Sequence, residues 1–177
     1  MHRSTTCIAA MAIGLFAATA AFADDNPLPK ANEVIAKYGE VEGWTAFSNK
    51  TRKNCYISRV FGSGAVQMGV TADPHIGYLG VFTKEDIGIR NGKQSEIFVS
   101  IAGKLYGGVA TGMKGDIQGG YTGGYILTDN ADFKLAVAKQ YEMIVFPQTK
   151  GAFVVDLTGT YKAMEMGRKC YKEQQPK

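Results

Sequence analysis

Few residues of this sequence could carry nucleophilic or acid–base chemistry. The sequence has two histidines, His2 and His75, and only His75 lies away from the N-terminus. With Asp73 and a serine such as Ser63, His75 would supply the residue types of a Ser-His-Asp triad. Ser63 has a glycine on either side but lacks the G-x-S-x-G pattern of a nucleophile elbow. We therefore expect no hydrolase and no catalytic residue in this chain.

Metal and cofactor sites are not expected either. One internal histidine rules out the multi-histidine metal sites. The run from Asp129 to Asp132 has oxygen ligands like a calcium loop, but the glycine and the closing glutamate of such a loop are missing. The glycine-rich run from Gly119 to Gly124 lacks the Lys-Ser or Lys-Thr ending of a phosphate-binding loop. The sequence thus predicts a protein that is not an enzyme and that holds no metal and no cofactor.

The first 23 residues have the pattern of a secretory signal peptide. A positive charge at Arg3 is followed by an apolar run from Cys7 to Phe22, with small residues at Ala21 and Ala23. We expect cleavage after Ala23 and a periplasmic or secreted protein. Because a lipid-anchoring cysteine would end the apolar run, and Cys7 begins it, we expect Cys7 to be discarded with the peptide.

Composition limits the partners of the mature chain. Removing 23 of the 177 residues leaves 154, a usual size for one domain. Of the 20 basic residues only Arg3 is lost, and none of the 16 acidic ones, so the net charge falls from +4 to +3. So small an excess does not favour nucleic acid. No later apolar run approaches the about 20 residues of a membrane-spanning helix, so we expect no membrane span.

Two cysteines remain in the mature chain, Cys55 and Cys170. An even number of cysteines in an oxidising compartment indicates a disulfide, and two cysteines allow one pairing. The alternative is a pair of free thiols for catalysis or metal binding. No C-x-x-C pair is present, and neither cysteine has a second cysteine or a histidine at ligand spacing. We therefore predict a Cys55–Cys170 bond that closes most of the domain into one loop.

A basic cluster surrounds the first of these cysteines. It consists of Lys50, Arg52, Lys53 and Arg59, with Tyr56 among them. One interpretation is a solvated loop and strand edge, where lysine also discourages edge pairing. The functional interpretation is a contact patch for an anionic envelope component or an acidic partner. Trp44, the one tryptophan, is expected in the core.

The remaining elements predict a mainly β fold. Short β-branched and aromatic runs separated by glycine predict strands at 44–47, 55–61, 66–70, 78–82, 97–101, 104–110, 121–127, 141–146 and 152–157. A short helix is predicted at 31–38, a helix capped by Asp129 or Asn130 at 131–139, and a last helix through Tyr171, capped by Thr158 or Thr160. We expect an antiparallel β-sandwich, or a strongly curved sheet or barrel. The predicted boundaries are 1–23 for the signal peptide, 24–43 for a lead-in, 44–171 for one domain and 172–177 for a flexible tail.

The 22 glycines have two competing explanations. They concentrate in the segments 62–69 and 103–124. In a strongly curved antiparallel sheet, glycine occurs at bulges and bends. Alternatively, the pairs Gly107-Gly108, Gly119-Gly120 and Gly123-Gly124 allow a ligand or a partner backbone to approach closely. The sequence leaves both explanations open.

The order of several landmarks resembles a known family. Trp44, then Cys55-Tyr56, then the run from Ile126 to Val145, then the segment from Asp156 to Thr160 and finally Cys170 resemble the invasion-associated locus B family of exported proteobacterial proteins. The resemblance covers most of the mature chain. It implies a β-sandwich-like periplasmic or envelope protein without established enzymatic activity, linked in some members to host-cell entry.

Three functions follow as hypotheses. The first is an exported envelope protein that binds a protein or a surface polymer without catalysis. The second is an inhibitor or immunity-type protein that blocks a lysozyme, protease or toxin with a rigid glycine-rich loop at 62–69. The third is a carrier of a small apolar ligand inside a closed β-barrel.

Overall fold

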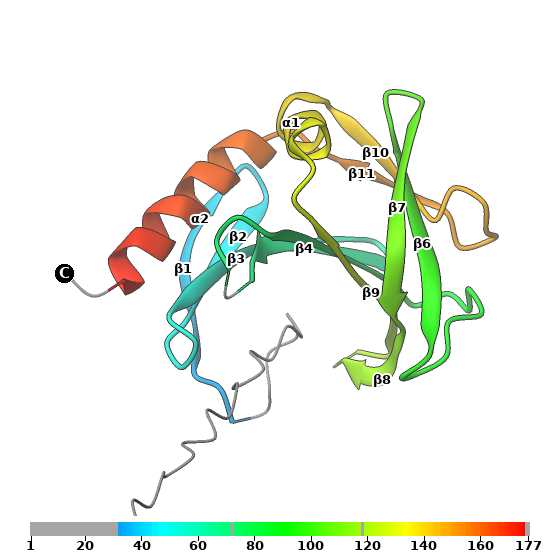
Figure 1. The fold of residues 1–177 in the computed structure, drawn as a ribbon, viewed down its shortest axis with the longest axis horizontal. Coiled ribbons are helices and arrows are strands. Elements are labelled where there is room, and N and C mark those ends of the chain that lie inside the picture. Colours follow the sequence, from blue (N-terminus) through cyan, green and yellow to red (C-terminus); the bar gives the residue numbers. More distant parts are fainter. Residues whose placement is uncertain (1–31, 72, 118, 176–177) are drawn as a thin grey trace, which may run out of the picture.

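The computed structural model describes residues 32–71, 73–117 and 119–175. Within them the chain forms two antiparallel sheets and two helices, α1 (Ala131–Lys139) and α2 (Thr160–Gln174), as Figure 1 shows. The predicted mainly β fold with a C-terminal helix is confirmed, and the described strands do not close into a barrel. The predicted signal peptide and its cleavage site after Ala23 lie outside the described residues.

The larger sheet has seven strands, and its first five form a meander. Across the sheet the order is β1-β2-β3-β4-β5-β9-β8. The strands are β1 (Ile35–Val41), β2 (Trp44–Asn49), β3 (Asn54–Phe61), β4 (Gly64–Val70), β5 (Gly77–Thr83), β8 (Met113–Ile117) and β9 (Tyr121–Thr128). Side chains alternate between the two faces of a strand, so Met68 and Leu79, which are register partners, share one buried face.

The smaller sheet has four strands in the order β11-β10-β6-β7. They are β6 (Gln94–Ile101), β7 (Lys104–Thr111), β10 (Glu142–Val145) and β11 (Phe153–Asp156). The predicted strands at 97–101 and 104–110 pair as the hairpin β6–β7, whose turn places Ala102 and Gly103 at positive φ. Figure 1 shows this sheet standing steeply against the larger one. The two sheets therefore enclose a core between them.

The main core lies between the larger sheet, the smaller sheet and the two helices. Its largest fully buried side chain is Trp44, which is 0% exposed, as predicted. The Trp44 Nε1 donates a hydrogen bond of 3.1 Å to the backbone carbonyl of Thr158, so the buried indole nitrogen has a partner. Val81, Val99 and Met143 bring both sheets into the same core. A smaller aromatic cluster around Tyr78, Phe82 and Tyr125 occupies the opposite face of the larger sheet.

The two helices begin differently. At α1 the Asn130 side chain accepts a hydrogen bond of 3.0 Å from the Phe133 backbone N–H, which confirms one of the two predicted caps. Phe133 and Val137 are buried, and Leu135 is half exposed. At α2 the prediction of a threonine cap is wrong. The cap position is Gly159 at φ +82°, where no side chain bonds the first turn.

Four features of the fold differ from the prediction. Residues 35–41 form strand β1 rather than a helix at 31–38, because hydrogen bonding to β2 outweighs the helical spacing of Val34, Ile35 and Tyr38. The β-rich unit therefore begins before residue 44. Strand β8 was not predicted from the sequence. Helix α2 continues to Gln174, so residues 172–174 belong to the helix and not to a tail.

Candidate binding pocket

The three residues with the types of a Ser-His-Asp triad do not come together in the structure. Ser63 is in the turn before β4 and His75 is in the turn after it. A seven-residue strand spans about 20 Å, so the two side chains are at opposite ends of β4. The Asp73 carboxylate instead accepts a hydrogen bond of 2.8 Å from the His75 backbone N–H within its own turn. Among the described residues, no group of three or more His, Cys, Asp or Glu side chains could hold a metal ion.

The basic cluster predicted from the sequence divides into two parts. Lys50, Arg52 and Lys53 lie in and beside the β2–β3 turn, where both lysines are exposed. Arg59 lies at the other end of β3 and stacks 4.9 Å from the Phe61 ring centroid. It donates to the backbone carbonyl of Asp156 at 3.1 Å and forms an ion pair of 3.2 Å with the same residue. Arg59 thus joins the larger sheet to β11 and is separate from the turn.

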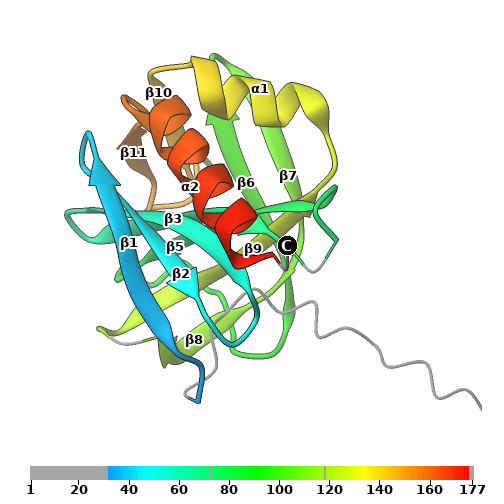
Figure 2. The same ribbon diagram turned by 90° about the vertical axis from the view of Figure 1, so that its left-hand side faces the viewer.

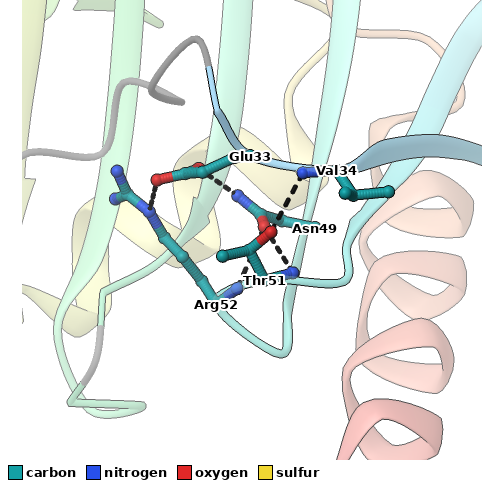
Figure 3. Close-up of polar contacts among 5 residues, drawn as sticks. All are labelled: Glu33, Val34, Asn49, Thr51 and Arg52. Carbon is teal, nitrogen blue, oxygen red and sulfur yellow. Dashed lines mark hydrogen bonds and ion pairs between the residues drawn. The ribbon is translucent and has the colours of Figure 1, made fainter.

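A buried carboxylate that the sequence did not reveal engages Arg52. The Glu33 side chain is 5% exposed and forms an ion pair of 2.6 Å with the Arg52 Nε (Figure 3). Asn49 donates a hydrogen bond of 2.5 Å to the same carboxylate, and the Val34 backbone N–H donates to the Thr51 hydroxyl at 3.0 Å. This network fastens the segment before β1 to the β2–β3 turn. The geometry gives Arg52 a structural role there.

Tyr56 does not lie with the basic residues either. It stacks on Phe47 with ring centroids 5.2 Å apart, on the face of the larger sheet that carries the aromatic cluster. Burial raises the pKa of its hydroxyl, and the nearby Glu33 carboxylate raises it further. The expected contact patch of Lys50, Arg52, Lys53, Arg59 and Tyr56 therefore does not form one continuous basic surface.

The structure instead contains an apolar pocket of about 510 Å³ between the helices and the larger sheet. We call it the helix–sheet pocket. Strands β3, β4 and β5 form its floor with Ile57, Met68 and Leu79, and the two helices form its walls. Figure 2 shows α1 and α2 on the same side of the larger sheet. The volume lies within the range of about 300–1,000 Å³ that is usual for small-molecule sites.

The disulfide fixes one wall of this pocket. Cys55 in β3 and Cys170 in α2 are bonded, with their Cα atoms 6.0 Å apart, which confirms the predicted pairing. Cys55 itself lines the pocket, and Cys170 is fully buried. Gly167 allows α2 to come close to the sheet, since a Cβ there would lie 3.3 Å from the Ile57 Cγ2. The wall from α2 is therefore held both covalently and by close packing.

Charged side chains of one sign line the pocket together with the apolar ones. They are Lys134 from α1 and Arg168 and Lys172 from α2, and no aspartate or glutamate lines it. The Lys134 Nζ donates a hydrogen bond of 2.8 Å to the His75 carbonyl, and Arg168 pairs with Glu165 on the helix surface. Long lysine and arginine side chains place their methylenes on apolar surface and their charges toward water. The pocket thus combines an apolar interior with a positive charge.

Part of this pocket had a signal in the sequence. Met164, Gly167 and Tyr171 recur at helical spacing, which is typical of residues that share one face of a helix. All three line the pocket. The sequence did not show that the face is only partly covered, because that depends on where α1 and the sheet lie.

Comparison of the chain with protein-family models, with curated proteins and with solved structures finds no match. No helix in the described part of the chain has both the length and the apolar character needed to cross a membrane. The disulfide is consistent with an exported protein.

Proposed function

We propose that this chain is an exported, non-enzymatic binding protein that carries a small apolar ligand in the helix–sheet pocket. The observation that supports it is the apolar pocket of about 510 Å³ with one wall fixed by a disulfide. This corresponds to the third hypothesis from the sequence, with one change. The ligand lies between helices and a sheet, not inside a closed barrel.

The physical reason is the solvation of the pocket walls. Val70, Pro74 and Met164 are apolar lining residues that keep exposed surface, so a ligand that covers them gains about 25 cal/mol per Å² of buried apolar surface. A preformed wall also reduces the entropy lost on binding. Both effects favour an apolar ligand over a polar one.

Direct detection tests this function. Native mass spectrometry of the freshly purified protein should reveal a co-bound small molecule. Titration with the uncharged fluorescent probe N-phenyl-1-naphthylamine should give a saturable signal with one site per chain. A spectrum without added mass, together with no saturable probe binding, would contradict the proposal.

A variant that fills the pocket tests whether the ligand binds there. Gly77 lines the pocket, and a Cβ there would lie 3.5 Å from the Lys134 Cε, which is ordinary contact. Gly77→Leu should therefore fill part of the pocket without a clash at Cβ and should weaken probe binding at least about 10-fold. Gly77→Ala is the matched control, since it adds only the Cβ. Equal probe affinity of Gly77→Leu and the wild-type protein would place the ligand elsewhere.

The other two hypotheses stay predictions. A protein or envelope-surface partner remains the expectation from the resemblance and from the basic residues around Cys55. A role as an inhibitor is tested by titrating lysozymes and proteases with the purified protein. Loss of enzyme activity at a stoichiometric ratio would favour that role over a ligand carrier.

A further inference from the structure

We propose that the helix–sheet pocket takes a single-chain amphiphile with an anionic head group, its tail inside and its head beside Lys134, Arg168 and Lys172. The inference rests on the proposed function, because it names the ligand class of the same pocket. It is carried by the lining, in which three residues are cations and none is an aspartate or glutamate.

The cations come from two elements that are far apart in the sequence. Arg168 and Lys172 are four residues apart on α2, so they lie one above the other on one face of that helix. Lys134 comes from α1, which lies beside α2 on the same side of the larger sheet (Figure 2). A head group between the helices would therefore meet positive charge from both of them.

Each cation keeps hydrogen-bonding capacity for a ligand. Lys134 uses one of its three donors on the His75 carbonyl, and two donors remain. Arg168 pairs with Glu165, but both side chains are more than half exposed, and such surface pairs are weak enough for a head group to compete. Within the described residues, no carboxylate forms an ion pair with Lys172.

The apolar part of the lining favours a hydrocarbon tail. The accessible apolar lining residues Val70, Pro74 and Met164 offer a polar group no good hydrogen-bond partner, so a ligand that is polar along its whole length would lose hydrogen bonds with water. A cationic head would be repelled by the lining cations. A neutral head can accept a hydrogen bond from them but gains no charge–charge attraction. An anionic head is the one charge type that the lining favours.

Isothermal titration calorimetry with four ligands that share one tail tests the head group. The ligands are decanoate, decyl phosphate, decanol and decyltrimethylammonium, each below its critical micelle concentration. At low salt the two anions should bind at least about 3-fold tighter than decanol, and the cation should bind most weakly. High salt should narrow this gap, because it screens exposed charges. Inorganic phosphate alone should bind far more weakly than decyl phosphate.

Charge-removing variants locate the head. Lys172→Gln and Arg168→Gln should each weaken decanoate binding about 2- to 5-fold and weaken decanol binding by less. The matched control is Lys150→Gln, which removes one positive charge at an exposed position in the β10–β11 turn, outside the pocket lining. It should leave both affinities unchanged. A stability measurement on each variant shows that the fold is intact.

The outcomes separate the two proposals. Equal affinity for decanoate and decanol, or an equal effect of Lys150→Gln and Lys172→Gln, would overturn the anionic head group and leave the carrier function standing. Binding of inorganic phosphate as tight as that of decyl phosphate would overturn the amphiphile. Failure of all four ligands and of the neutral probe to bind would overturn the carrier function itself.

Discussion

The Cys55–Cys170 bond joins β3 to α2, and its removal is the perturbation whose size the structure specifies best. The two cysteines are 115 residues apart in the sequence, so the bond closes most of the folded chain into one loop. In the double variant Cys55→Ala/Cys170→Ala the unfolded chain regains the freedom that this loop removes. The folded state should persist, because α2 still packs on β3 through contacts such as Gly167 against Ile57.

The magnitude follows from the loop length. The chain-entropy relation with about 115 residues gives close to 4.8 kcal/mol at 25 °C, and residual structure in the unfolded chain reduces that figure. We therefore expect the free energy of unfolding to fall by about 2–5 kcal/mol. For a chain of this size, each kcal/mol corresponds to about 2–4 °C in melting temperature, so the expected decrease is about 5–20 °C.

Urea denaturation followed by circular dichroism measures this loss. The oxidised wild-type protein is compared with the double variant and with wild-type protein held in reductant. The variant and the reduced protein should show the same lowered midpoint, because both lack the same covalent link. An unchanged midpoint in the variant would refute the entropic reasoning. Reaction of both cysteines with a thiol reagent in the native, unreduced protein would refute the bond itself.

Three further predictions concern single side chains. Asn130→Ala removes the oxygen that caps α1 and should lower the free energy of unfolding by about 1 kcal/mol in urea denaturation. Burial raises the pKa of the Tyr78 and Tyr125 hydroxyls, so the stability from keeping them protonated is complete below about pH 10, the pKa of an unfolded tyrosine, and is lost as the pH rises above it. Melting temperatures measured up to about pH 12 should show that decline, and Tyr125→Phe should reduce it. Gly80→Ala places a Cβ 2.4 Å from the Tyr125 ring and should cost about 1–3 kcal/mol, whereas Gly108→Ala, with its nearest neighbour at 3.4 Å, should be close to neutral.

The sequence predicted those elements whose local pattern agrees with the fold. In β6 the apolar residues alternate with others, and Ile97, Val99 and Ile101 are each at most 1% exposed. Strand β1 was missed because Val34, Ile35 and Tyr38 have helical spacing, and the hydrogen bonds to β2 decide the outcome. The two strands are joined by the turn Glu42-Gly43, with both residues at positive φ, so the pairing had a local hairpin signal that the helical spacing obscured.

The pocket could not be predicted from the sequence, because its lining is assembled from distant segments. It comes from four strands and two helices, and Cys55 and Lys172 are far apart in the sequence. Periodicity predicted which face of α2 is apolar. It could not predict that α1 and α2 leave a space over β3, β4 and β5. The strand order and the disulfide together decide that arrangement.

Glycines in the strands make room for aromatic side chains of the neighbouring strands. Several strand glycines have an aromatic register partner on the neighbouring strand, and the aromatic ring lies against the glycine. The pairs are Gly69 with Tyr78, Gly80 with Tyr125, Gly107 with Phe98 and Gly123 with Phe82. At each of these glycines a Cβ would lie 2.2–2.7 Å from an atom of the partner ring. Glycine at these positions thus leaves room for an aromatic ring of the same sheet, an arrangement known to stabilise strand glycines.

These contacts favour a structural role for the glycines over close approach of a ligand or a partner backbone. At Gly107 and Gly123, two positions where a ligand or partner backbone could have approached, the space above the glycine is taken by Phe98 and Phe82. Phe82 belongs to the aromatic cluster on one face of the larger sheet, while the opposite face carries the helices. The opposite face of the larger sheet is covered partly by the smaller sheet and partly by the two helices, and the open space lies beside the helices. The fold therefore places its apolar pocket there, beside the cations of α1 and α2.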